Sequence, residues 1–255
     1  WSDPSTRQLL ATVRDRLADL PVLLVVSARQ ADDLPAGRAE TLELDPLPAQ
    51  AARRLASNAA PAELTPAELW RVVEHAAGVP LYIEELVRVV AGEGSSEGGV
   101  PTSLRDLLLA RLDGLGEAKR VVQVGALVGQ LLDAGLLASV LREPAERVAG
   151  ELSALVEAGV LEPCPELGAG YYRFRHALVR EAASGSITAE QRRRWHARIA
   201  EAQLDPDGSL GGVDPAQAAE HLAEGGYPTE AVARFQEAAE AARQGAALEE
   251  AERLF

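Results

Sequence analysis

The chain contains no methionine and only one cysteine. Because translation begins with methionine, 255 residues that open at Trp1 are expected to be a segment of a longer protein. The single Cys164 excludes an internal disulfide and a zinc site built from cysteines, which fits a reducing compartment. We expect Cys164 to be a small filler residue at the turn between Pro163 and Pro165.

Long apolar runs are also missing. No run approaches the roughly 18 residues that a membrane-spanning helix needs, and the N-terminus lacks the basic-then-apolar pattern of a signal peptide. We therefore expect a cytoplasmic protein.

Aromatic residues make up only 4% of the chain, and basic residues are outnumbered by acidic ones, which gives a net charge of −14. Such a charge repels phosphate backbones and anionic membranes. The densest basic cluster is Arg192-Arg193-Arg194. We expect no direct nucleic-acid binding by this segment and no membrane partner. Abundant Ala, Leu, Arg and Glu favour helices.

The front of the chain is predicted to contain the remnant of an α/β core. Residues 4–18 read as a helix, and the continuous apolar run 21–28 is typical of a buried parallel strand. The alternating residues 41–44 predict a further short strand.

Beyond residue 45 the pattern is almost entirely helical. Prolines or capping residues mark most of the expected starts, and the small-polar stretch 92–99 reads as a linker. Helices are expected at 48–59, 66–77, 80–91, 101–115, 117–129, 133–141, 144–158, 176–183 and 189–203.

A hairpin is predicted between two of these helices, from strands near 160–162 and 171–175. Helices followed by such a hairpin are typical of a winged helix. From Pro215 the alternation of small and large residues resembles a tetratricopeptide-type helix pair. Because one pair cannot bury its own face, we expect further repeats beyond Phe255.

Three places carry candidate site residues. Arg29 follows the expected strand, where it could hold a phosphate or pair with a carboxylate at the sheet edge. Gly78 can end one helix and Pro80 can begin the next, and Pro80 could also pack against a purine. His176 could cap a helix or reach a phosphate at its N-terminus.

Catalytic patterns are absent. The four histidines lack metal-ligand spacing, and no G-x-x-x-x-G-K-[ST] phosphate loop, G-x-S-x-G or H-E-x-x-H motif occurs. For Asp3, Glu84 and Glu85 we expect solvated or capping roles. No catalytic residue and no metal site is assigned.

Taken in order, several motifs resemble the ATPase module of STAND-type, AAA+-like signal-transduction ATPases, as found in large LuxR-type transcriptional regulators and ATPase-linked bacterial adenylate cyclases. The motifs are WSDPST, VLLVVSAR, LELDPLPAQAARRL, AAGVPLYIEELVR, VPTSLRDLLLARLDGLG and YYRFRHALVREAA. The resemblance implies a mainly α fold. Its parts would be an ATPase-core remnant at 1–45, a helical lid at 46–115, a winged helix at 116–187, and a linker helix with the first TPR-like repeats at 188–255.

The resemblance also assigns roles. Arg29 is similar to the family's sensor arginine, Gly78 and Pro80 belong to its G-x-P motif with Pro80 against adenine, and His176 matches the winged-helix histidine that touches the β-phosphate of ADP. An Asp often follows that histidine in the family, and here Ala177 stands in its place. The parent is expected to bind ATP or ADP with Mg²⁺. Without a phosphate loop and Walker B acids, these residues alone are expected to be inactive.

The implied function is a nucleotide-dependent switch in a transcriptional regulator, with an inducer bound by the repeats and self-association on ATP. One alternative is a nucleotide-free helical scaffold that recruits a protein partner. Another is a DNA-binding winged helix, although the would-be recognition helix carries Glu146, Glu151 and Glu157 against Arg147 alone.

Overall fold

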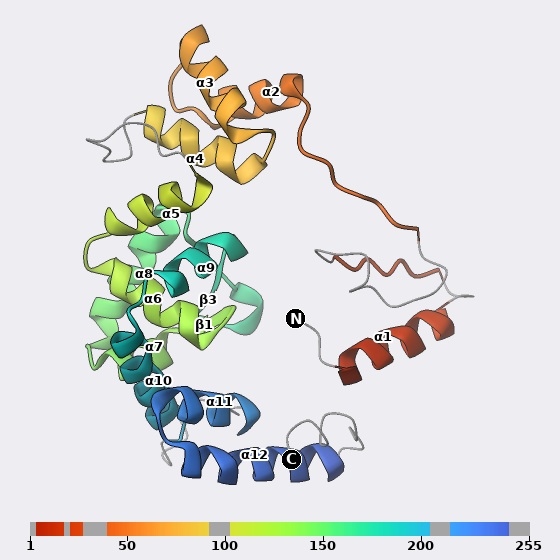
Figure 1. Cartoon of the computed structure of the whole chain (residues 1–255), viewed down its shortest axis with the longest axis vertical. Helices are drawn as coiled ribbons and strands as arrows, with labels where there is room; N and C mark the ends of the chain where they lie inside the picture. The colour runs from red at the N-terminus through yellow and green to blue at the C-terminus, as the bar shows by residue number, and fades with distance from the viewer. Residues whose placement is uncertain (1–3, 18–20, 28–39, 92–102, 205–214, 245–255) are drawn as a thin grey trace. The chain divides into compact units, whose positions relative to one another are not determined.

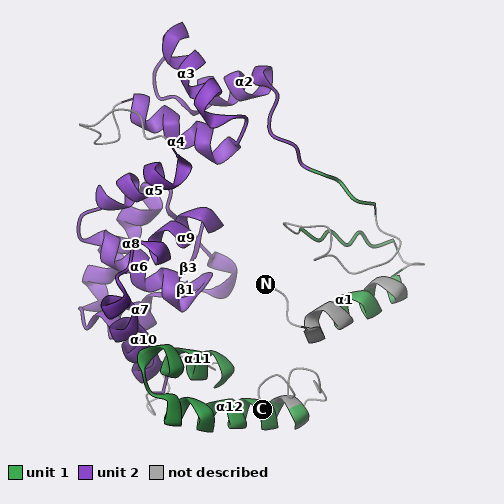
Figure 2. Ribbon diagram, viewed as in Figure 1, with its two compact units in different colours: residues 1–43, 212–255 green, residues 44–211 purple. Residues whose placement is uncertain are grey.

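The protein is mainly helical, with twelve α-helices and one small antiparallel sheet among the described residues of the computed structural model (Figure 1). Those residues are 4–17, 21–27, 40–91, 103–204 and 215–244. The chain divides into two compact units, one of residues 1–43 with 212–255 and one of residues 44–211 (Figure 2).

The first unit contains α1 (Pro4–Leu17) and a helical hairpin of α11 (Pro215–Gly225) and α12 (Pro228–Gln244). The two hairpin helices pack against each other, as Figure 1 shows. Their contact is built largely from small residues, which let helix backbones approach closely. The buried set includes Ala218, Ala219, Leu222, Ala231, Ala238 and Ala239.

The strands predicted at 21–28 and 41–44 are wrong for the residues that the structure describes. Residues 21–27 and 40–44 lie outside any sheet. Their apolar side chains face solvent, with Leu23 86% and Leu44 89% exposed. A buried parallel strand forms backbone hydrogen bonds with neighbouring strands on both sides. An isolated extended segment has no such hydrogen bonds to offset the conformational entropy that it would lose on becoming ordered. Arg29 lies outside the described residues.

Three helices of the second unit form a first hydrophobic cluster: α2 (Ala49–Ala59), α3 (Pro66–Ala76) and α4 (Pro80–Val90). Helix α3 begins with a capping box, in which the Thr65 side chain accepts from the Glu68 amide and the Glu68 carboxylate accepts from the Thr65 amide. The cluster closes around fully buried aliphatic residues and small alanines, among them Ala56, Val72, Ile83, Leu86 and Val87. We call α2–α4 the three-helix bundle.

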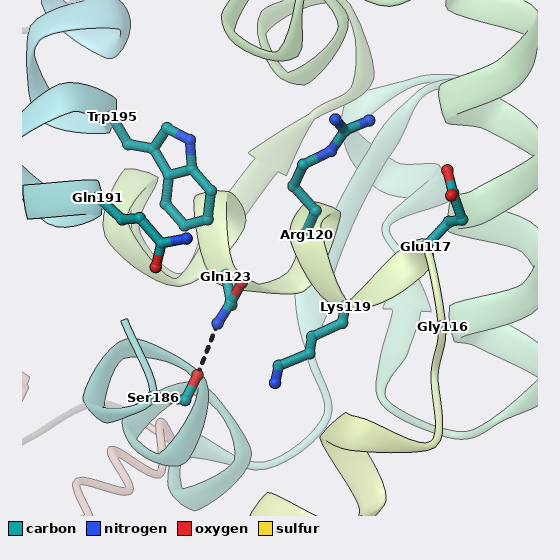
Figure 3. A pocket seen from close by; sticks show the side chains of 8 residues that line it. All are labelled: Gly116, Glu117, Lys119, Arg120, Gln123, Ser186, Gln191 and Trp195. Atoms are coloured by element: carbon teal, nitrogen blue, oxygen red, sulfur yellow. Dashed lines mark hydrogen bonds between the residues drawn. The ribbon is translucent and has the colours of Figure 1, made fainter. Parts of the chain in front are cut away.

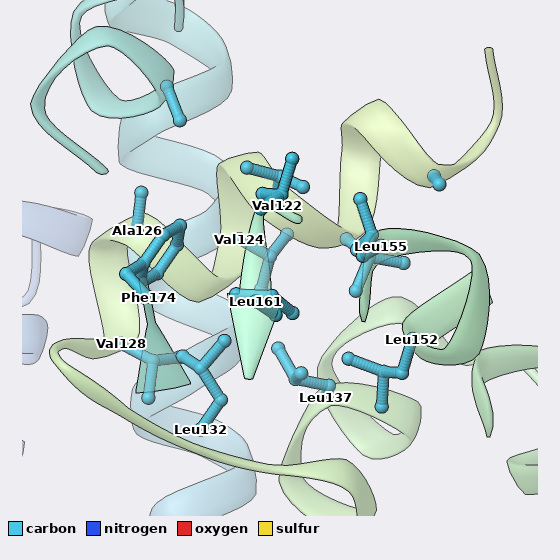
Figure 4. Close-up of a cluster of buried hydrophobic side chains, with 14 of the residues drawn as sticks. Val122, Val124, Ala126, Val128, Leu132, Leu137, Leu152, Leu155, Leu161 and Phe174 are labelled. Carbon is cyan, nitrogen blue, oxygen red and sulfur yellow. The ribbon is translucent and has the colours of Figure 1, made fainter. Parts of the chain in front are cut away.

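A sheet body follows in the same unit, and it consists of a three-stranded sheet of order β1-β3-β2 with the helices around it. Figure 4 shows the interior of its cluster, to which Phe174 and Leu161 contribute from the sheet and Leu152 and Leu155 from a helix. Its elements are α6 (Ala118–Val128), β1 (Leu131–Asp133), α7 (Ala134–Leu141), α8 (Ala145–Glu157), β2 (Leu161–Pro163), a 3-10 turn (Pro165–Leu167), β3 (Tyr171–Phe174), α9 (Ala177–Gly185) and α10 (Ala189–Gln203).

The sequence predicted a two-stranded hairpin, and the sheet has a third strand, β1. It pairs antiparallel with β3, so that Leu132 lies opposite Tyr172. Three residues are too few for a period-two pattern to stand out between helices. Leu132 is fully buried whereas Leu131 is 43% exposed, which is the alternation that a strand requires.

Helix α5 (Leu104–Asp113) is shared by the two clusters of this unit. Leu107 belongs to the cluster of the three-helix bundle, whereas Leu108 and Leu112 belong to the cluster of the sheet body. Because adjacent helical residues point about 100° apart, one short helix can serve both cores. The bundle and the body therefore meet along α5.

Candidate functional site

The Gly78-Val79-Pro80 segment makes a sharp left-handed turn between α3 and α4. Ala77 has a φ of 47° and Gly78 a φ of 77°. The Gly78 carbonyl accepts a hydrogen bond of 2.8 Å from the Leu47 amide. A Cβ on Gly78 would lie 2.5 Å from the Leu47 carbonyl oxygen, so this position has no room for a side chain. Two motifs that the sequence gives separately, LELDPLP and AAGVP, thus contact each other.

Pro80 begins α4 and is exposed. Its fixed φ suits the first helical turn, where the missing amide hydrogen costs nothing. The Pro80 ring is therefore free to contact a ligand. The need for glycine at position 78 is explained by its backbone contact with Leu47 alone.

His176 is the N-cap residue of α9, with extended backbone angles and no side-chain capping hydrogen bond. The helix amides at this end favour an anion. Burial lowers the pKa of His176 below its ordinary value of 6.5, and the cations Arg175 and Arg111 add to the lowering. Glu84 and Glu162 act in the opposite direction. The imidazole is thus neutral at pH 7 and can donate one ring N–H.

Pro80 on α4 and His176 at the start of α9 lie on helices that both contact α5. Glu84, one helical turn after Pro80, is among the charges that raise the pKa of His176 against the effect of burial. Arg29, the third candidate of the sequence, is not among the residues that the structure describes.

Glu85 was expected to be solvated or to cap a helix, and this expectation is wrong. Its side chain is buried at 3% exposure and forms an ion pair with Arg111 of α5. Arg111 also donates to the carbonyl of Ala158, at the C-terminal end of α8. Arg88 donates to the same carbonyl at 3.2 Å. The sequence gives little sign that Glu85 is the buried residue of the two. Glu84 and Glu85 are adjacent and of the same type, so only their different directions around the helix distinguish them.

Burial shifts the pKa of both members of this pair toward the neutral form, in opposition to their mutual attraction. Burial raises the pKa of Glu85 in spite of the attraction of Arg111 and Arg88. Burial lowers the pKa of Arg111 in spite of Glu85. Both shifts have the same physical cause, because each charge loses more hydration than its partner replaces.

A separate hollow of about 390 Å³ lies between α6 and α10 (Figure 3). Its lining is mixed, because Lys119, Gln123, Ser186 and Gln191 contribute polar groups beside Trp195. Gln123 donates to the Ser186 hydroxyl at 2.9 Å. His176 is the N-cap of α9 and Ser186 is its C-cap. At 1.5 Å per helical residue, the hollow beside Ser186 lies about 15 Å from His176. None of the candidate residues from the sequence lines it.

In the part of the chain that the structure describes, no three His, Cys, Asp or Glu side chains gather as metal ligands. No described helix is both long and apolar enough to cross a membrane.

No family model matches the chain. The chain is 29% identical, over 272 aligned positions, to an uncharacterized protein of Rhizobium meliloti (strain 1021). The similarity covers 100% of this chain and 26% of that protein. The chain therefore spans about a quarter of the length of the relative, whose name states no activity.

Proposed function

We propose that this chain is the lid and winged-helix part of an ATP- and ADP-binding STAND-type ATPase, which acts as a nucleotide-dependent switch in a transcriptional regulator. The observation that carries the proposal is the partly buried His176 at the N-terminus of α9, whose side chain makes no capping hydrogen bond, together with the exposed Pro80 at the start of α4. An exposed proline ring and an uncapped imidazole at a helix N-terminus are suited to a base and a phosphate.

In this proposal Pro80 packs against adenine and a neutral His176 donates its N–H to the terminal phosphate of ADP. A bound nucleotide would therefore stabilise the arrangement in which α4 and α9 are close. Exchange for ATP would change the contact at His176 and shift the equilibrium toward a more open form. Mg²⁺, an inducer for the repeats and self-association on ATP belong to the proposal for the whole protein.

The same proposal places residues 1–45 in a nucleotide-binding α/β core. Support comes from the apolar run 22–26, whose residues are 40–86% exposed in this structure. A run of this composition is typical of a strand buried on both faces of a parallel sheet. Partner strands would have to come from elsewhere in the intact protein.

Direct DNA binding by α8 is disfavoured by its ion pairs. Arg147 lies within ion-pair distance of Glu117, Glu143 and Glu151. A cation already surrounded by three carboxylates gives little attraction to a phosphate backbone.

The test uses the intact protein and two matched prolines. Pro66 and Pro80 each begin an 11-residue helix. We expect Pro80→Ala to weaken ADP binding about fivefold, because losing an apolar contact of about 1 kcal/mol has that effect. Pro66→Ala should leave ADP affinity unchanged. Equal affinities of both variants and wild type, measured by titration calorimetry, would contradict the contact at Pro80.

A further inference from the structure

We propose that Glu85, Arg111 and Arg88 form a polar latch that holds the three-helix bundle on the sheet body and can open. The latch is independent of any nucleotide. It joins the bundle helix α4, the shared helix α5 and the carbonyl of Ala158, which follows α8.

The first argument is connectivity. Arg88 of the three-helix bundle contacts Ala158, 70 positions along the chain, and Glu85 contacts Arg111, 26 positions along the chain. Both arginines converge on one carbonyl at the end of a helix, where the helix dipole is negative and favours cations. The latch therefore fixes the distance between α4 and the end of α8.

The second argument is crowding of like charge. A Cβ built on Gly159 would lie 3.3 Å from Arg88 Nη2, 3.5 Å from Arg175 Nη1 and 3.7 Å from Arg111 Nη2. Three guanidinium groups thus surround one backbone position, and Glu85 is the carboxylate buried among them. Removing Glu85 leaves mutually repelling cations, so the surfaces should separate.

The third argument is that each side has its own core. The bundle cluster and the body cluster are separate sets of buried residues, which meet at α5 through Leu104, Leu107 and Leu108. Opening the latch therefore leaves both cores folded. A buried polar contact, unlike an apolar one, regains hydration when it opens, which makes it suited to a reversible joint.

Double electron–electron resonance on the 255-residue chain tests the latch. Spin labels are placed at Glu74→Cys on α3 and Ser153→Cys on α8, both exposed positions, in a Cys164→Ala background. The unmodified latch should give one narrow distance distribution. Glu85→Gln and Arg111→Met should each add a second population at longer distance.

Two further variants make the result specific. The apolar double variant Glu85→Leu with Arg111→Met should restore the narrow distribution, because an apolar contact replaces the paired charges. Glu117→Gln, which removes a carboxylate from the exposed pair with Arg147, should leave the distribution unchanged.

Circular dichroism first establishes that each variant is helical. If Glu85→Gln does not fold, the partly exposed Arg88→Met takes its place, with the same expected second population. Single variants with the distribution of the unmodified latch would overturn the proposal. A double variant as open as the single ones would also overturn it.

Discussion

Gly78 shows at the residue scale how one backbone position arranges the three-helix bundle. Its carbonyl holds Leu47, and its left-handed conformation directs the chain from α3 into α4. The sequence predicted a helix boundary at Gly78 and Pro80 from their usual roles as stop and start signals. It did not predict the contact with Leu47, because that contact joins segments about thirty residues apart.

Gly78→Ala should lower the free energy of unfolding by more than Gly116→Ala. Both glycines have positive φ, 77° and 57°, so both alanines carry the left-handed penalty of about 1–2 kcal/mol. Only at Gly78 does the added methyl meet backbone, at 2.5 Å from the Leu47 oxygen, whereas nothing lies within 4 Å at Gly116. Urea unfolding of the two variants measures the difference, and equal losses would contradict the close contact.

His176 makes a pH-dependent contribution to stability. Because burial lowers its pKa in the folded protein, the unfolded chain binds a proton more readily between that lowered pKa and 6.5. The free energy of unfolding should therefore rise with pH through this window and level off above it. His176→Gln removes this rise. Urea unfolding of both proteins from about pH 5 to about pH 7.5 tests the sign. Parallel pH profiles would show that the folded state leaves His176 unperturbed.

At the element scale, the helices could be predicted and the strands only partly. Ala, Leu and Glu at helical spacing, with Pro and Thr at the starts, predicted most helix positions to within a few residues. The apolar run 21–27 predicted burial, but a strand's burial depends on partner strands that the described residues do not provide. Strand β1 was missed because three residues hardly show a period.

The strand β1 contributes to the core through one side chain. Leu132→Ala should lower the free energy of unfolding by about 2–5 kcal/mol, because a fully buried leucine leaves a cavity. The neighbouring Leu131→Ala should cost less than about 1 kcal/mol, because that side chain is 43% exposed. Thermal or urea unfolding distinguishes the two. A cost at Leu131 as large as at Leu132 would contradict the register of β1 with β3.

The ion pair between α4 and α5 has a thermodynamic consequence of its own. The double variant Glu85→Leu with Arg111→Met should be as stable as the wild type or more stable, by up to about 4 kcal/mol. Each single variant should lose about 3–5 kcal/mol, because one buried charge remains without its partner. A double-mutant cycle by urea unfolding measures both. Additive losses would show that the two side chains act independently.

On the scale of the whole molecule, a chain with net charge −14 holds several of its arginines in contacts between elements. Arg88, Arg111 and Arg147 are all engaged with carboxylates or carbonyls of other elements. The mainly helical class could be predicted from composition. The buried ion pair between Glu85 and Arg111 could not, because it depends on which of two adjacent glutamates turns inward.

Nucleotide binding by the intact protein tests the central claim most directly. His176→Ala should weaken ADP binding about tenfold to a hundredfold, which corresponds to a hydrogen bond with a charged group. His75→Ala, at an exposed histidine of α3, is the control and should bind ADP like the wild type. Titration calorimetry with ADP and with ATP gives both constants. A selective loss of ADP affinity in His176→Ala is the predicted result, and unchanged ADP affinity in that variant would contradict the switch.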